Sequence, residues 1–165
     1  MNKIKILSDQ LINQIAAGEV VERPASVVKE LIENSIDAKA SIIQIEINNS
    51  GLDLIRITDN GTGMSFDDAV LSMERHATSK IKEEEDLHRI STMGFRGEAI
   101  ASIASVSKFT IRTKTENENS GTIIQSEGGN ILKKEPIGFQ NGTQIEVAEL
   151  FFNTPARKKY LKTES

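Results

Sequence analysis

The chain has 165 residues, a formal net charge of −4 and no cysteine. A chain of this length forms one domain, and the lack of cysteine excludes disulfide bonds, thiolate metal sites and cysteine nucleophiles. The net negative charge argues against a domain whose main function is to bind nucleic acid. No apolar run approaches the roughly 20 residues that cross a bilayer, and the N-terminus lacks the pattern of a secretory signal. We therefore expect a cytoplasmic protein with no membrane partner.

The first half of the chain predicts helices around a strand hairpin. Apolar residues at helical spacing, with Ser8 and Pro24 at starting positions, indicate the helices. Alternating isoleucines on either side of the turn sequence NNSG indicate the two strands. The expected helices cover 8–18, 24–38 and 66–75, and the expected strands cover 41–48 and 53–60.

The second half predicts a loop, one helix and a run of strands. The loop spans His76–Gly97, which is poor in apolar residues, and the helix spans Gly97–Ala104. Four strands are expected over 106–113, 121–127, 130–137 and 142–150. This order indicates an α+β fold, a mixed, mostly antiparallel sheet with helices on one face. We expect one domain over 1–150, with 151–165 beginning the connection to a second domain.

The helix sequence KELIENSIDA (29–38) carries oxygen-bearing side chains beside a core stripe. At 100° per residue, Glu30 and Asn34 stack one turn apart next to Leu31, whereas Asp37 lies further round toward solvent. A carboxylate in this position can take a proton from water, and an amide oxygen can bind Mg²⁺. The alternative is that both residues form the polar flank of an amphipathic helix.

A second candidate motif is ITDNGTGM (57–64). Period-two alternation turns Asp59 toward the core, where a carboxylate needs a hydrogen-bond donor such as the amino group of a purine. Gly61 and Gly63 then allow the backbone to approach a flat ligand closely. The alternative is an Asp-Asn-Gly turn in which Asp59 caps the local backbone.

A third candidate motif is MGFRGEA (93–99), where glycines flank Arg96 at the start of a helix. The free N–H groups of a helix N-terminus suit phosphate oxygens, and ATSK (77–80) adds hydroxyls and an ammonium. The alternatives are a surface arginine in a glycine-rich loop and an ordinary polar loop. His76 and His88 are too isolated to form a convincing metal pair.

Together these motifs resemble a known family. VVKELIENSIDA, DNGTGM, GFRGEA and NGT are similar to the four nucleotide-binding motifs of the GHKL ATPase superfamily. RHATSKI, GFRGEA and FFNTPAR resemble the MutL family of DNA mismatch repair proteins specifically, and the resemblance runs from about Ile6 to Thr163. It implies a Bergerat-type α/β sandwich that binds ATP and Mg²⁺.

The resemblance also assigns roles to residues. It implies that Glu30 is the general base for the attacking water, that Asn34 binds Mg²⁺, and that Asp59 bonds the adenine amino group with help from Gly63 and Thr143. The loop 76–97 would be a lid over the phosphates. The lid residues expected around them are Thr78, Ser79, Lys80, Gly94, Phe95, Arg96 and Gly97.

In such a family, ATP binding orders the lid and joins two N-terminal regions into a homodimer that relays mismatch recognition to downstream repair factors. A second (transducer) domain supplies a lysine to the γ-phosphate, and DNA is contacted mainly elsewhere. We therefore expect this chain to bind ATP but to hydrolyse it poorly. The alternatives are another GHKL ATPase, such as a histidine kinase, and a nucleotide-independent DNA-binding or protein-interaction module based on the basic tail Arg157–Lys162.

Overall fold

The computed structural model describes residues 23–73 and 96–155. Within these ranges the regular elements are a short 3₁₀ turn, η1 (Asn49–Gly51), three α-helices and six strands. The helices are α2 (Pro24–Asp37), α3 (Phe66–Met73) and α6 (Arg96–Ser105). The strands are β1 (Ile43–Asn48), β2 (Leu54–Asp59), β3 (Lys108–Lys114), β4 (Gly121–Glu127), β5 (Asn130–Ile137) and β6 (Gly142–Ala148).

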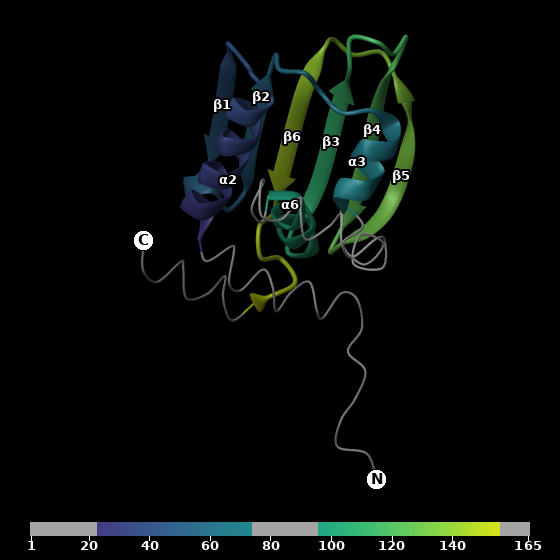
Figure 1. The fold of residues 1–165 in the computed structure, drawn as a ribbon. Coiled ribbons are helices and arrows are strands. Elements are labelled where there is room, and N and C mark those ends of the chain that lie inside the picture. The colour runs from purple at the N-terminus through teal and green to yellow at the C-terminus, as the bar shows by residue number, and fades with distance from the viewer. Residues whose placement is uncertain (1–22, 74–95, 156–165) are drawn as a thin grey trace, which may run out of the picture.

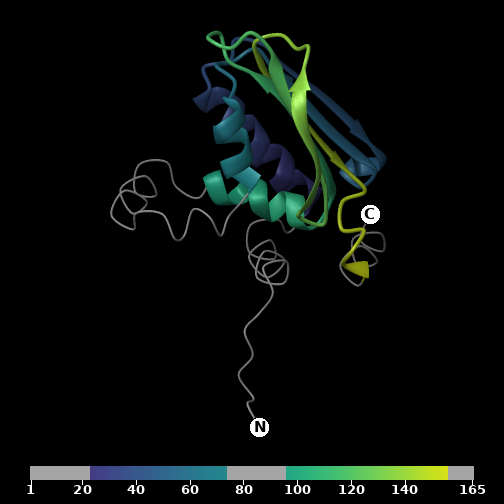
Figure 2. The same cartoon turned by 90° about the vertical axis from the view of Figure 1, so that its right-hand side faces the viewer.

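The six strands form one antiparallel sheet in the order β1-β2-β6-β3-β4-β5 (Figure 1). The last strand in sequence, β6, lies between β2 and β3 and so joins the N-terminal hairpin to the C-terminal strands. Figure 2 shows the three helices gathered on one face of this sheet. The predicted α+β class, with helices on one face of the sheet, is confirmed.

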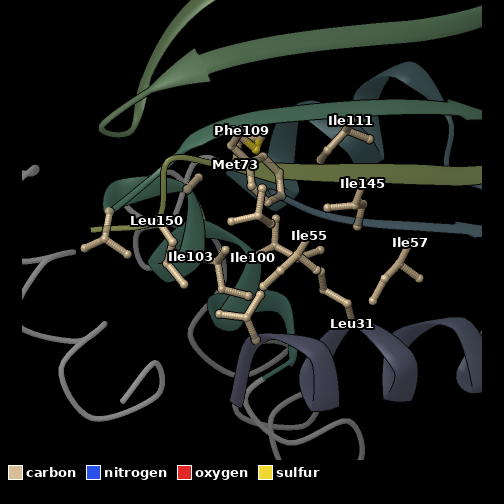
Figure 3. Packing of buried hydrophobic residues seen from close by; sticks show 14 of the residues in the cluster. Leu31, Ile55, Ile57, Met73, Ile100, Ile103, Phe109, Ile111, Ile145 and Leu150 are labelled. Carbon is tan, nitrogen blue, oxygen red and sulfur yellow. The ribbon is translucent and has the colours of Figure 1, made fainter. Parts of the chain in front are cut away.

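The core lies between the sheet and the helices. Alternation along the strands turns Ile57, Ile145, Ile111 and Ile124 to the same face, and each stands opposite the next across neighbouring strands. Leu31 of α2 packs beside Ile55 and Ile57 of β2, at one end of this row (Figure 3). Burying one such side chain stabilises the fold by roughly 1.5–3 kcal/mol. The aliphatic row therefore fixes both the register of the strands and the position of α2.

The edge strand β1 is more exposed than the strand with which it pairs. Ile45 and Ile47 stand opposite the buried Ile57 and Ile55, yet they remain 45% and 47% exposed. The strand also begins at Ile43 rather than at residue 41, because Asn60 Oδ1 accepts the backbone N–H groups of the two preceding residues. The alternating pattern correctly places Ile45 and Ile47 on the inner face of the sheet, but it does not show whether another element covers that face at the edge strand.

The other predicted elements agree with the structure within a few residues. The helix expected over 66–75 is described as far as Met73, and the helix expected from Gly97 begins one residue earlier. α2 ends at Asp37, where the backbone N–H of Ala38 bonds to the carbonyl of Asn34. The expected helix over 8–18 and the loop between residues 76 and 95 lie outside the described residues, as does the tail after Pro155.

Candidate functional site

A row of buried polar side chains crosses the inner face of the sheet next to the aliphatic row. Asp59 of β2 stands opposite Thr143 of β6, Thr143 opposite Thr113 of β3, and Thr113 opposite Thr122 of β4. Their exposed fractions are only 7%, 8%, 0% and 3%. Burying a polar group without a hydrogen-bond partner is costly, so this row needs partners from the protein or from a ligand.

Asp59 is held by two donors from different elements. Ser35 of α2 donates its hydroxyl hydrogen to Oδ2 at 2.6 Å, and the backbone N–H of Gly61 donates to Oδ1 at 2.8 Å. The second bond is the local turn that the sequence left open as an alternative. Each carboxylate oxygen can accept a further hydrogen bond, so Asp59 keeps acceptor capacity for a ligand donor.

Thr143 is tied to the neighbouring strand through Thr113. Their hydroxyl oxygens lie 2.8 Å apart, and Thr113 Oγ1 also accepts the backbone N–H of Met64 at 2.8 Å. Thr113 donates to the carbonyl of Gly142 at 3.0 Å. The hydroxyl of Thr113 thus links β3, the start of β6 and the loop after β2.

Two glycines allow the backbone to close around this row. Gly63 has a φ of +73°, and a Cβ atom there would lie 2.0 Å from the carbonyl oxygen of Lys114. Gly142 has a φ of +126°, and its Cβ atom would lie 2.1 Å from the carbonyl oxygen of Asp59. Both positions exclude a side chain. Gly63, singled out from the sequence for ligand approach, therefore already has a structural role in packing against β3.

Glu30 and Asn34 lie one turn apart on α2, both half-buried, and Asn34 directly precedes the Ser35 that binds Asp59. The Nδ2 atom of Asn34 is buried and has no hydrogen-bond partner within the described ranges. Such an amide marks a position where a ligand or water is expected. Asp37 lies at the exposed end of the helix.

The structure therefore brings Asn34, Asp59, Gly63 and Thr143 to one end of the sheet beside α2. Gly97 and the backbone of Arg96 form the first turn of α6, a helix that packs against α2 and α3. The remaining predicted site residues lie outside the described ranges: Thr78, Ser79, Lys80, Gly94 and Phe95.

Sequence reasoning missed two residues of this site. Ser35 follows Val27 and Leu31 at a spacing of four and is a polar residue within the buried stripe of α2, a signal that the sequence already contains. Thr113 alternates with Phe109 and Ile111 on the inner face of β3, but its partners depend on strand order. No local pattern could have found the partners of Thr113.

Comparison with known proteins decides the family. A family model described as "Histidine kinase-, DNA gyrase B-, and HSP90-like ATPase" matches residues 22–149. The chain belongs to this ATPase family. The GHKL resemblance that the motifs indicate is confirmed.

Relatives within the family are mismatch repair proteins. DNA mismatch repair protein MutL of Caldanaerobacter subterraneus is 59% identical over the whole chain, and the MutL of Streptococcus agalactiae is 62% identical over 99% of it. The chain spans 28% and 25% of the lengths of these two proteins. The resemblance to MutL is thus confirmed for about a quarter of such a protein.

Solved structures agree with this assignment. The Aquifex aeolicus MutL ATPase domain complexed with ADP is 40% identical, with a TM-score of 0.64, over 86% of this chain and 48% of that one. The N-terminal domain of a DNA repair protein is 32% identical, with a TM-score of 0.73, over 96% of this chain and 46% of that one.

Among the described residues, no helix is both long and apolar enough to span a membrane.

Proposed function

We propose that this chain binds ATP together with Mg²⁺ and serves as the nucleotide-dependent switch of a MutL-type mismatch repair protein. The observation that carries the proposal is the buried carboxylate of Asp59, held by Ser35 and Gly61 with acceptor capacity to spare. The ADP complex of the Aquifex aeolicus relative supports the same assignment.

The base end of the nucleotide would lie against the polar row. The exocyclic amino group of adenine is a hydrogen-bond donor, and Asp59 and Thr143 stand opposite one another with oxygen acceptors on the same face. A donor from the ligand would use the acceptor capacity that Asp59 and Thr143 keep beyond their bonds within the chain. Gly63 keeps the adjoining loop close to this row because it carries no side chain.

The phosphate end would lie beside α2. Asn34 offers an amide oxygen, one of the hard oxygen donors that Mg²⁺ prefers. Bound Mg²⁺ would neutralise charge on the phosphates. Glu30 would take a proton from the attacking water. We propose that the lid 76–97 surrounds the phosphates through Thr78, Ser79, Lys80, Gly94, Phe95, Arg96 and Gly97.

Nucleotide binding would act as a switch in the longer protein. In this proposal residues 1–150 form the ATP-binding domain, and 151–165 lead into a second domain that supplies a lysine to the γ-phosphate. The isolated chain would then bind ATP and hydrolyse it slowly. Homodimerisation through N-terminal regions would relay mismatch recognition to downstream repair factors, with DNA contacted mainly elsewhere.

The test of binding is a calorimetric titration with a non-hydrolysable ATP analogue, with and without Mg²⁺. Asn34→Ala removes a proposed oxygen ligand of Mg²⁺, so Mg²⁺-dependent binding should weaken by about 10- to 100-fold. The affinity for the analogue measured without Mg²⁺ should change little. The matched control is Asn130→Ala, because Asn130 is exposed at the turn between β4 and β5. Equal Mg²⁺ dependence in wild type and Asn34→Ala would remove Asn34 from the site.

The test of hydrolysis is the steady-state ATPase rate of this chain beside that of the longer protein. The proposal expects the longer protein to be faster, and Glu30→Gln to abolish its turnover while leaving analogue binding intact. Equal rates for the short and long proteins would contradict the role of the second domain.

A further inference from the structure

The hydroxyl of Thr113 is fully buried and has three polar neighbours but only one hydrogen to donate. The Met64 backbone N–H is a donor only, and the Gly142 carbonyl is an acceptor only. Thr143 is the one neighbour that can take either role. The direction of the Thr113–Thr143 bond therefore decides what Thr143 presents to a ligand.

One arrangement satisfies every group in this cluster. Thr113 donates to the Gly142 carbonyl at 3.0 Å, and its two lone pairs accept the N–H of Met64 and the hydroxyl hydrogen of Thr143. In the reverse arrangement, Thr113 donates to Thr143 and gives up its bond to Gly142. Buried polar groups favour the arrangement that leaves none of them without a partner.

In the satisfied arrangement, the base end of the site presents acceptors only. The hydrogen of Thr143 is used on Thr113, so Thr143 offers lone pairs. The hydrogen of Ser35 is used on Asp59 Oδ2, and the Asp59 carboxylate has no hydrogen of its own. None of these three side chains keeps a donor for a ligand.

We propose that Thr113 is a positioning residue for specificity: by binding the Thr143 hydroxyl hydrogen, it prevents Thr143 from donating to a carbonyl oxygen on the base. The inference rests on the proposed nucleotide function and adds a mechanism of selection to it. A purine with an amino group at position 6 fits a surface made only of acceptors. At position 6 itself, a purine with a carbonyl places an acceptor against these acceptors, and the donor that this base gains at N1 lies one ring position away.

The experiment compares ADP with IDP, whose base carries a carbonyl oxygen where adenine has its amino group. The measured quantity is the ratio of the two dissociation constants for the same protein sample. This ratio does not depend on the folded fraction of a variant, because partial unfolding weakens the apparent binding of both nucleotides equally. Wild type should prefer ADP.

Thr113→Val keeps the shape of the side chain and removes its hydroxyl, which frees Thr143 to donate to IDP. We expect the IDP/ADP ratio of dissociation constants to fall about tenfold or more, which corresponds to one hydrogen bond. Thr113→Ser should restore the wild-type ratio. Thr110→Val is the matched control, since Thr110 lies on the same strand as Thr113 but on the outer face of the sheet, opposite Glu146. It should leave the ratio unchanged.

The outcomes separate the two proposals. If wild type prefers ADP but Thr113→Val keeps that preference, the inference about Thr113 is wrong and the nucleotide function stands. A wild type that binds both nucleotides equally overturns the inference and the contact proposed between Asp59 and the adenine amino group, while nucleotide binding itself stands. If wild type binds neither nucleotide, the proposed function fails and the inference fails with it. Should Thr113→Val not fold, Thr113→Ala removes the same hydroxyl with less crowding and is subject to the same criteria.

Discussion

The two faces of the sheet carry two different kinds of polar row on the same strands. On the outer face, Arg56 pairs with Glu46 at 2.7 Å and with Glu146 at 3.6 Å, and Arg112 pairs with Glu146 as well. On the inner face, Asp59 and the threonines form hydrogen bonds, and Asp59 has no ion-pair partner in the part of the chain that the structure describes.

The difference lies in what each row leaves available to a ligand. Outer charges of opposite sign meet across strands and stay partly hydrated. Partial burial lowers the pKa of Arg56, but hydrogen bonds and charges from Glu46 and Glu146 raise it above its ordinary value overall. The inner row is buried and dominated by acceptors. We infer that the outer row serves stability and solubility, whereas the inner row keeps acceptor capacity for a donor from outside the chain.

The largest expected effect on ADP affinity comes from replacing a hydrogen-bond acceptor of the inner row with a donor. Asp59→Asn can place an NH₂ donor where the purine amino group would donate, so ADP affinity should fall by about 100-fold or more. Calorimetry or fluorescence titration measures this change. Asp53→Asn is the control, since Asp53 is exposed in the same hairpin. Near wild-type affinity in Asp59→Asn would show that the base lies elsewhere.

A smaller effect, on folding rather than on recognition, is expected at Gly63. In Gly63→Ala the new Cβ atom would clash with the Lys114 carbonyl at a positive φ, which should lower the free energy of unfolding by about 1–3 kcal/mol. Gly138→Ala is the control because its Cβ atom would meet nothing within 4 Å. Urea unfolding of both variants checks the result, and equal stabilities would argue against this close approach.

Disrupting the ion pairs of the outer row should change the free energy of unfolding by still less. Glu146→Gln weakens the pairs with Arg56 and Arg112, and surface ion pairs of this kind contribute about 0–1 kcal/mol each. The free energy of unfolding should therefore change by roughly 1 kcal/mol or less, with unchanged ADP affinity. A large loss of nucleotide affinity would show that the two rows are not independent.

The smallest expected effect concerns alkaline pH. The hydrogen bond from Lys108 Nζ to Glu149, at 2.8 Å, and the negative charge of Glu149 raise the pKa of Lys108 above 10.5. The stabilisation is present below the unfolded pKa and is lost as the pH rises through the higher folded pKa. Unfolding measured from pH 9 to 12 should show a slightly smaller alkaline decline in Lys108→Met than in wild type. Identical dependence of the unfolding free energy on pH in the two proteins would contradict a stabilising contribution from the Lys108–Glu149 pair.

The parts of the site that sequence could predict are those that depend on local periodicity. Helical spacing placed Glu30 and Asn34 on one flank of α2, and alternation turned Asp59 toward the core. The polar row itself could not be predicted, because Thr143 meets both Asp59 and Thr113 only when β6 lies between β2 and β3. Strand order is a property of the whole fold. The exposure of Ile45 similarly depends on what packs over an edge strand.

The most direct test of the central claim is a crystal structure of this chain with ADP. We expect the adenine amino group within hydrogen-bonding distance of the Asp59 carboxylate, with Thr143 beside the base and the phosphates near Asn34. A well-ordered ADP whose base lies away from Asp59 and Thr143, with the inner row bonded only to water, would contradict the claim that this row is built for a purine.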